Sequence, residues 1–222
     1  MLKMKNILVF PAAMLLSLSM LTAQVQVSKE PRHKKVLENK YIRLLDVWLQ
    51  PGDTSLFHIH STPSVFLIFT SATTVSQVKG GQWEKSESVP GTSWYRSFFQ
   101  DTLIHRVGNC GTTPFHVNDA EILSSWNKKD SLAPLPFFIL YNTEKAIAYK
   151  LMDFSFNGQI ISDRGPMIAE LVEGDEIIFH DTKNKKSTSI KNGKYLYIEP
   201  GSSFYFSAKE SEKINLVLFE IK

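Results

Sequence analysis

Two histidines separated by one residue end the stretch Gly52-Asp53-Thr54-Ser55-Leu56-Phe57-His58-Ile59-His60. Side chains alternate between the two faces of a β-strand, so residues two apart share a face. The stretch begins with a glycine directly after Pro51, a pair that is typical of a turn. We therefore predict that His58 and His60 lie side by side on one face of a strand that follows a tight turn.

The sequence around this stretch also has the alternating pattern of β-strands. Strands are expected at 41–49, 56–60, 65–78, 83–89, 94–99, 103–107 and 115–123. Turn pairs such as Gly80-Gly81 and Pro90-Gly91 separate them, whereas helical periodicity is nearly absent. Only residues 24–40 are expected to form a short helical or irregular lead-in. Short strands at this spacing predict an all-β, antiparallel sandwich or barrel.

A second series of strand patterns follows a polar, proline-containing connection at 124–135. Strands are expected there at 146–156, 168–173, 176–180, 188–191, 195–199, 202–206 and 214–221. Turn residues recur between the two halves at a near-constant distance. Gly52 and Gly158, like Asn109 and Asn215, are 106 positions apart, and Pro90-Gly91 and Pro200-Gly201 are 110 apart. This repetition predicts an internal duplication.

A third histidine, His105, lies on a later expected strand. An imidazole from that strand would join His58 and His60 to give three nitrogen ligands, with positions left open for water or substrate. A reactive metal centre needs such open positions, whereas a structural zinc site is closed. Histidines that face solvent or form hydrogen bonds in the core are the alternative interpretation. Spacing alone leaves both interpretations open.

The stretch 52–60 resembles the first half of the first cupin motif, a glycine, five residues and then His-x-His. The segment His105-Arg106-Val107-Gly108-Asn109 resembles the end of the second cupin motif, a histidine followed four residues later by asparagine. The resemblance covers about residues 36–123, and the rest of the chain resembles a degenerate second cupin. It implies two antiparallel jelly-roll barrels, the first with a metal bound by the three histidines, and the pairing into homodimers that many cupins show.

The sequence departs from the cupin pattern in both motifs. Ser64 and Val65 stand where the first motif usually has a glutamate ligand, and Gln100 and Thr102 replace a proline and a glycine of the second. Three-histidine sites without the carboxylate also occur among cupins, in thiol and diketone dioxygenases. An all-imidazole set suits Fe²⁺, Ni²⁺, Cu²⁺ or Zn²⁺ better than the hard cation Mn²⁺.

The remaining candidates are expected to have structural roles. The second half has no histidine set, because at the offset of 106 positions His58 falls on Arg164 and His60 on Pro166. We expect His33 and His180 at the surface, and His116 at a sheet edge or near the cavity. Cys110 is expected in the interior, and Glu170 and Glu173 at strand ends or the surface. Most of the large aromatic residues are expected in the core, namely Trp48, Trp83, Trp94, Phe57, Phe66, Phe98, Phe99 and Phe115. Patterns for nucleophile elbows, phosphate-binding loops and His-Glu-x-x-His zinc sites are absent from the sequence.

The composition is that of a folded protein, with 222 residues of which 43% are hydrophobic and 21% charged. The first 23 residues resemble a secretory signal peptide, since Lys3 and Lys5 precede an apolar segment. Removing them lowers the net charge from +3 to +1, which argues against a nucleic-acid partner. We predict a secreted or periplasmic protein without stable membrane insertion after cleavage. The predicted organisation is a signal peptide at 1–23, a lead-in at 24–35, a cupin domain at 36–123, a linker at 124–135 and a degenerate cupin-like domain at 136–222.

Two functions remain open from the sequence. The first is an enzyme, an oxygenase or isomerase that binds a small organic substrate at a three-histidine metal centre. The second is a non-catalytic module that binds a small molecule or a metal in the same cavity. Both require that the three imidazoles converge, and without convergence only an exported β-scaffold remains.

Overall fold

The computed structural model describes residues 24–126, 133–152, 154, 156–209 and 213–222. Within them the chain is all-β, with one short 3₁₀ helix, η1 (Val27–Lys29), and no α-helix. The predicted all-β class is therefore confirmed. The predicted signal peptide and residues 127–132 of the predicted linker lie outside the described residues. No helix in the described part is long and apolar enough to span a membrane.

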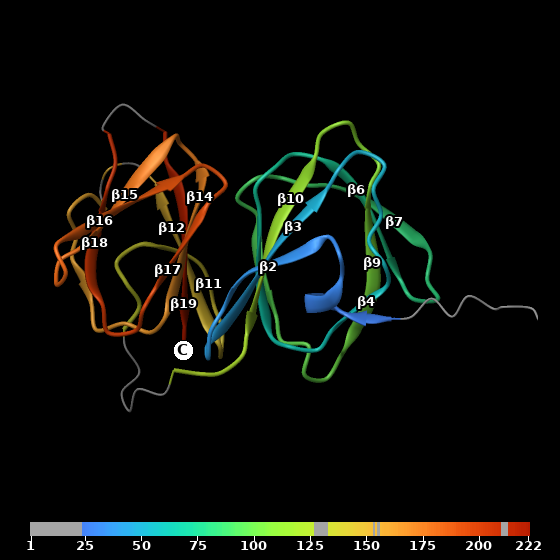
Figure 1. The fold of residues 1–222 in the computed structure, drawn as a ribbon, viewed down its shortest axis with the longest axis horizontal. Helices are drawn as coiled ribbons and strands as arrows, with labels where there is room; N and C mark the ends of the chain where they lie inside the picture. Colours follow the sequence, from blue (N-terminus) through green and yellow to red (C-terminus); the bar gives the residue numbers. More distant parts are fainter. Residues whose placement is uncertain (1–23, 127–132, 153, 155, 210–212) are drawn as a thin grey trace, which may run out of the picture.

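Two five-stranded sheets from the first half of the chain form a sandwich (Figure 1). One sheet has the order β1 (Val25–Gln26), β4 (His58–His60), β9 (Leu103–Asn109), β6 (Thr73–Val78) and β7 (Trp83–Glu87). The other has the order β2 (His33–Glu38), β3 (Ile42–Leu49), β10 (Phe115–Ile122), β5 (Ser64–Ile68) and β8 (Ser93–Arg96). Neighbouring strands are antiparallel except β1 and β4, which are parallel.

The second half of the chain forms another sandwich with a matching strand order (Figure 1). Its larger sheet has the order β11 (Phe138–Asn142), β12 (Ala146–Met152), β19 (Asn215–Ile221), β14 (Met167–Glu173) and β17 (Tyr195–Ile198). Its smaller sheet has the order β13 (Ile161–Ser162), β18 (Ser203–Ser207), β15 (Glu176–Asp181) and β16 (Lys186–Lys191). The shared order is the pattern expected of a duplicated chain. All four described sheets are open, so each predicted barrel is a two-sheet sandwich whose sheets do not close on themselves.

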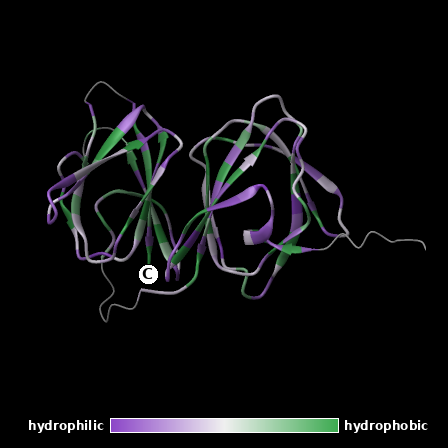
Figure 2. Ribbon diagram, in the orientation of Figure 1, coloured by the Kyte–Doolittle hydropathy of each residue, from purple (hydrophilic) through white to green (hydrophobic). Residues whose placement is uncertain are grey.

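Three hydrophobic layers stabilise this arrangement, one inside each sandwich and one between them. In the middle layer, Ile42 and Ala120 of the first half pack with Ala148, Ile168 and Phe219 of the second. Strands β10 and β19 are covered on both faces and are therefore buried along their whole length. Figure 2 shows hydrophobic segments on the strands that face one another at the centre of the molecule.

Several strand boundaries differ from the predicted ones, and β11 and β13 were not predicted. The run 65–78 is two strands, β5 and β6, which belong to different sheets. Ser88 stabilises the segment that connects β5 to β6. Its hydroxyl donates to the carbonyl oxygen of Thr70 and accepts from the backbone N–H of Ala72, both at 2.8 Å. The lead-in, in turn, forms β1, η1 and β2, so it adds a strand to each sheet. The predicted turn is confirmed at Gly52, whose φ of +85° is a left-handed conformation that glycine adopts without strain.

Several aromatic residues that were expected in the core are exposed. Phe66, Phe98 and Phe115 are buried, as predicted. The prediction is wrong for Trp48, Trp83, Trp94 and Phe99, which are exposed. Strand β7, which contains Trp83, is an edge strand whose residues are all exposed, so hydrophobicity alone does not place a residue in the core.

Cys110 is also exposed, which corrects the prediction of a buried thiol. It follows the end of β9, where the chain turns, and its Sγ lies 3.5 Å from the carbonyl oxygen of Thr73. We expect the native protein to react with iodoacetamide within about tenfold of the rate of the urea-unfolded protein, since exposure controls access to the thiol. The added mass, followed over time with Cys110→Ser as the blank, measures both rates. Labelling that requires denaturant would contradict the exposed position.

Candidate metal centre

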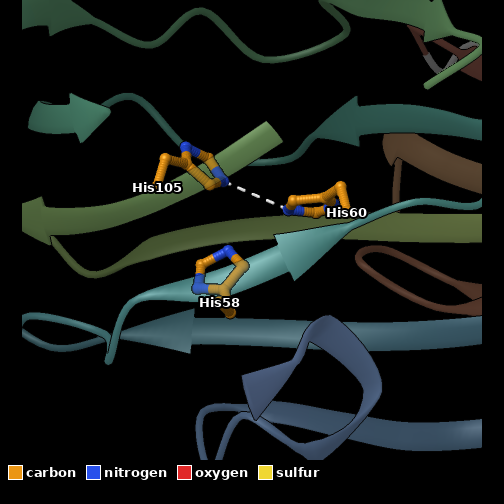
Figure 3. A group of neighbouring side chains, drawn as sticks. All are labelled: His58, His60 and His105. Atoms are coloured by element: carbon orange, nitrogen blue, oxygen red, sulfur yellow. Dashed lines mark hydrogen bonds between the residues drawn. The ribbon is translucent and has the colours of Figure 1, made fainter. Parts of the chain in front are cut away.

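The structure brings the three predicted histidines together. Strand β4 pairs with β9 so that His58 lies opposite His105, and His60 follows two residues later on the same face. One nitrogen atom from each ring lies within 4.8 Å of the other two, and the Nε2 atoms of His60 and His105 are 3.1 Å apart. Figure 3 shows the three rings around one common space. Their convergence is thus a structural fact, while metal binding by them stays a prediction.

A cavity of about 120 Å³ lies between the two sheets of the first sandwich. Most of the residues that line it are hydrophobic, and the full set is His33, Val47, Leu49, His58, His60, Phe66, Trp94, His105, Val107, Phe115, Val117 and Asp119. A cavity of about 150 Å³ in a protein core can hold one benzene molecule. The site therefore has room for a molecule of about the size of a single ring.

Burial keeps the three imidazoles neutral. It lowers the pKa of His58 to about 4 and that of His105 to about 3, and it also lowers the pKa of His60. The neighbouring imidazoles lower these pKa values further, because a second positive charge beside the first is unfavourable. At neutral pH each ring therefore offers an unprotonated nitrogen, the form that binds metals.

The second nitrogen of two rings faces an oxygen atom, and in His58 it forms a hydrogen bond. His58 Nδ1 lies 2.9 Å from the carbonyl oxygen of Leu56 and must donate to it, which leaves Nε2 free. His60 Nδ1 lies 3.4 Å from Oδ2 of Asp119. Histidines that bind metals commonly have their other nitrogen held by a carbonyl or a carboxylate. Ligand atoms about 2.1 Å from one metal lie about 3.0 to 3.4 Å apart, so the 3.1 Å between His60 and His105 also fits a shared transition metal.

Asp119 is a candidate functional residue that the sequence analysis missed. It lies on β10 opposite Phe66 of β5, and burial raises its pKa well above the usual range, with a further increase from the charge of Glu121. Among the described residues, neither oxygen of Asp119 has a hydrogen-bond partner, and neither does Nδ1 of His60. One signal could have found it, because the acid follows Phe115 and Val117 at alternating positions that otherwise face a hydrophobic interior.

We expect Asp119→Asn to weaken Zn²⁺ binding about 10- to 100-fold at pH 7, the usual effect of losing the carboxylate behind a metal-binding histidine. Asparagine cannot ionise, so it cannot supply the negative charge that a bound cation would favour on Asp119 and that would strengthen His60 as a ligand. Competition with a chromogenic chelator measures the affinity. Asp181→Asn, at a half-buried acid of the second sandwich, is the matched control. Equal affinity in both variants and the wild type would show that Asp119 does not support the site.

His33 is buried rather than on the surface, which corrects its predicted position. Its Nδ1 lies 2.7 Å from Oε2 of Glu30, and its ring centroid is 4.6 Å from that of His58. The ring also lines the cavity. The sequence analysis did not find this residue because it lies in the lead-in, whose strands were not recognised.

His116 does not line the cavity and does not lie at a sheet edge. Strand β10 is the central strand of its sheet, and the buried ring stacks on Trp48 and Phe69 at centroid distances of 3.9 and 4.5 Å. Its Nε2 lies 2.7 Å from Oδ1 of Asp46. His116 therefore stays outside the proposed ligand set but has a different structural role from the one expected.

The two glutamates of the second half have different environments. The side chain of Glu173 is 45% exposed and pairs with Lys213 at 2.8 Å, as expected of a surface acid. The prediction is wrong for Glu170, which is buried between the sandwiches and accepts a hydrogen bond of 2.5 Å from Nδ2 of Asn118. Burial raises the pKa of Glu170 to about 8.

The second sandwich has hydrophobic residues at the positions of two of the three histidines. Strands β13 and β18 correspond to β4 and β9 in the sheet order, and they place Ile161 opposite Phe204, where the first sandwich has His58 opposite His105. The structure therefore matches His58 with Ile161 and not with Arg164, whose guanidinium instead pairs with Glu220 at 2.6 Å. Among the described residues, the only group of potential metal ligands is the one in the first sandwich.

No protein-family model matches the sequence, and no curated protein matches it. Several solved structures match the fold. AerE from Microcystis aeruginosa matches with a TM-score of 0.56 and 11% identity over 87% of this chain and 98% of AerE. Salicylate 1,2-dioxygenase from Pseudaminobacter salicylatoxidans matches with a TM-score of 0.60 and 9% identity over 86% and 76% of the two chains. A cupin 2 conserved barrel domain protein from Leptotrichia buccalis matches with a TM-score of 0.54 and 10% identity over 85% and 88%.

The fold and the site define a protein of two β-sandwiches with a cluster of neutral histidines in one of them. The solved structures that share the fold include a cupin 2 conserved barrel domain protein. The chain accordingly has the cupin fold, as the sequence motifs implied.

Proposed function

We propose that this chain holds a small organic molecule beside a metal bound by His58, His60 and His105. The observation that carries the proposal is the convergence of three neutral imidazoles on a cavity whose lining is mostly hydrophobic. An all-imidazole set fits Fe²⁺, Ni²⁺, Cu²⁺ or Zn²⁺. Such a metal, when bound, supplies a Lewis acid for an oxygen or sulfur atom of the substrate and, if it is iron, the means to react with dioxygen.

The protein's own residues have separate tasks in this proposal. The three histidines hold the metal, and Asp119 orients His60 through Nδ1. Phe98 covers His60, because its buried ring stacks on the imidazole at a centroid distance of 5.1 Å. The hydrophobic walls keep water away from the reacting molecule, which strengthens the polar interactions that remain.

An oxygenase is the reaction class that we propose. The dioxygenase among the solved structures with the same fold supports this choice, as does a donor set without a carboxylate ligand from β5. A binding module that uses the same cavity without turnover is the alternative, and it is an outcome of the experiment that follows.

The experiment starts with metal analysis of untagged protein. We expect about one transition metal per chain after loading, and little in a variant with all three histidines replaced by alanine. The protein is then loaded anaerobically with Fe²⁺, Ni²⁺ or Cu²⁺ and mixed with oxygen and thiols, diketones or phenols. Oxygen uptake supports an oxygenase, and the absence of oxygen uptake with every metal supports the binding module. Equal metal content in the wild type and the variant would overturn the proposal.

We further propose that the chain acts after export. The signal-like segment at 1–23 supports this, since basic residues precede an apolar run there. Fractionation of cells that produce the full chain, with sequencing of the mature N-terminus, tests it. A mature protein that begins at Gln24 is expected, and a full-length chain that stays in the cytoplasm would contradict export.

A further inference from the structure

We infer that His33 is a hydrogen-bonding anchor for the molecule in the cavity, with Nε2 as the acceptor. The ligand class that this defines is a small, uncharged molecule with a hydrophobic body and one hydrogen-bond donor, such as a hydroxyl group. The inference rests on the proposed function only in that it uses the same cavity, and it assigns a role to a residue outside the three-histidine set.

Glu30 fixes the orientation and the tautomer of His33. This buried carboxylate accepts hydrogen bonds from Nδ1 of His33 at 2.7 Å, from the backbone N–H of Arg32 at 2.6 Å and from that of Leu56 at 3.1 Å. Burial raises the pKa of Glu30, but these hydrogen bonds together lower it below its ordinary value. An ionised carboxylate only accepts, so Nδ1 of His33 carries a proton, and Nε2 is the ring nitrogen that Glu30 leaves for another partner.

The other edge of the His33 ring is left for a ligand. The side chain is 8% exposed and lines the cavity. Among the described residues no hydrogen-bond partner of Nε2 is present, since the contacts of His33 are those with Glu30 through Nδ1 and with the ring of His58. A donor on a bound molecule would give this nitrogen a hydrogen-bond partner.

The rest of the cavity limits what that molecule can be. Its volume of about 120 Å³ suits a molecule of about one ring. The stacked rings of Phe66 and Trp94, 4.7 Å apart, belong to its hydrophobic wall. The lining itself contains no lysine or arginine, and the guanidinium of Arg96, whose charge helps to lower the pKa of His60 and His105, lies over the ring of Phe98. We therefore expect an uncharged molecule to fit the lining better than an anion.

A purely structural role for His33 is the competing explanation, in which the ring only connects η1 and β2 to Glu30. The two roles use different nitrogen atoms. Asparagine places its amide near the position of Nδ1, so His33→Asn keeps the donor to Glu30 and removes Nε2. Glutamine reaches the position of Nε2, so His33→Gln restores an acceptor toward the cavity and gives up the Nδ1 donor.

Phenol and toluene are the probes, because they have similar size and only phenol has a donor. Calorimetry measures both dissociation constants with metal-free and with Zn²⁺-loaded protein. We expect the preference for phenol over toluene to fall about tenfold in His33→Asn, the effect of losing one hydrogen bond, and to stay within about threefold of wild type in His33→Gln. His180→Asn, in the second sandwich, is the control and is expected to keep the wild-type preference.

The outcomes separate this inference from the proposed function. A wild-type phenol preference in His33→Asn overturns it, and so does a loss in His33→Gln as large as the loss in His33→Asn. Failure of the wild type to bind phenol in either form also overturns it. Failure to bind Zn²⁺ contradicts the proposed function alone, because the phenol preference of the metal-free protein still reports on His33.

Discussion

His60→Ala is expected to lower the affinity for Zn²⁺ at pH 7 by more than about 100-fold, beyond the effect of losing a residue that only supports a ligand. The variant removes the nitrogen that lies 3.1 Å from Nε2 of His105, and two imidazoles remain where three converged. Metal analysis and chelator competition measure the loss. Wild-type protein should also gain thermal stability when Zn²⁺ is added, because the metal binds only the folded state, and the variant should not.

The matched control is His180→Ala. His180 lies on β15 of the second sandwich, and both of its ring nitrogens contact serine hydroxyls, Ser187 at 2.9 Å and Ser207 at 2.8 Å. Its replacement should leave the metal content unchanged. Circular dichroism of the metal-free proteins shows whether His60→Ala stays folded. If a folded His60→Ala bound Zn²⁺ as tightly as the wild type, the metal would not lie at the three histidines.

Glu170→Gln is expected to remove a strong pH dependence from the free energy of unfolding. Burial raises the pKa of Glu170 to about 8 in the folded protein, whereas its ordinary value is 4.5. Between these two pH values the folded state therefore holds a proton that the unfolded state has released. Wild-type stability should consequently fall as the pH rises from about 4.5 to about 8, by at most about 1.4 kcal/mol per pH unit from this group.

Glutamine cannot ionise, and its side-chain oxygen can still accept the hydrogen bond from Asn118. The variant should therefore be more stable than the wild type at pH 8 and close to it at pH 5. Urea unfolding at several pH values from 5 to 9 measures the difference. Glu173→Gln is the control, because Glu173 is exposed three residues away on the same strand. Parallel pH profiles of Glu170→Gln and the wild type would show that Glu170 is ionised in the folded protein.

The predictable part of the site depends on local geometry. His58 and His60 share a face because side chains alternate along any strand, and the turn at Gly52 needs only a glycine. His105 was added to this pair because its segment resembles the second cupin motif and follows the first motif in the chain, as in cupins. The all-β class followed in the same way from short alternating segments separated by turn residues.

The parts of the site that were missed depend on which strands become neighbours. Asp119 faces the cavity because β10 is the central strand between β3 and β5, and the same strand turns Asn118 toward the second sandwich. His33 reaches the histidines only because the lead-in forms β1 beside β4 and β2 beside β3. Glu170 is buried because a second sandwich covers it, although its own segment resembles an ordinary strand.

The amino-acid sequence by itself determined the strands, the turns and the common face of His58 and His60, because these features depend on residues close together in the chain. Only the tertiary structure decided that His33 and Asp119 belong to the same cavity, that Trp83 is exposed and that Ile161 and Phe204 occupy the histidine positions in the second sandwich. Burial and pairing between distant strands set these features, and neither depends on any single segment of the sequence.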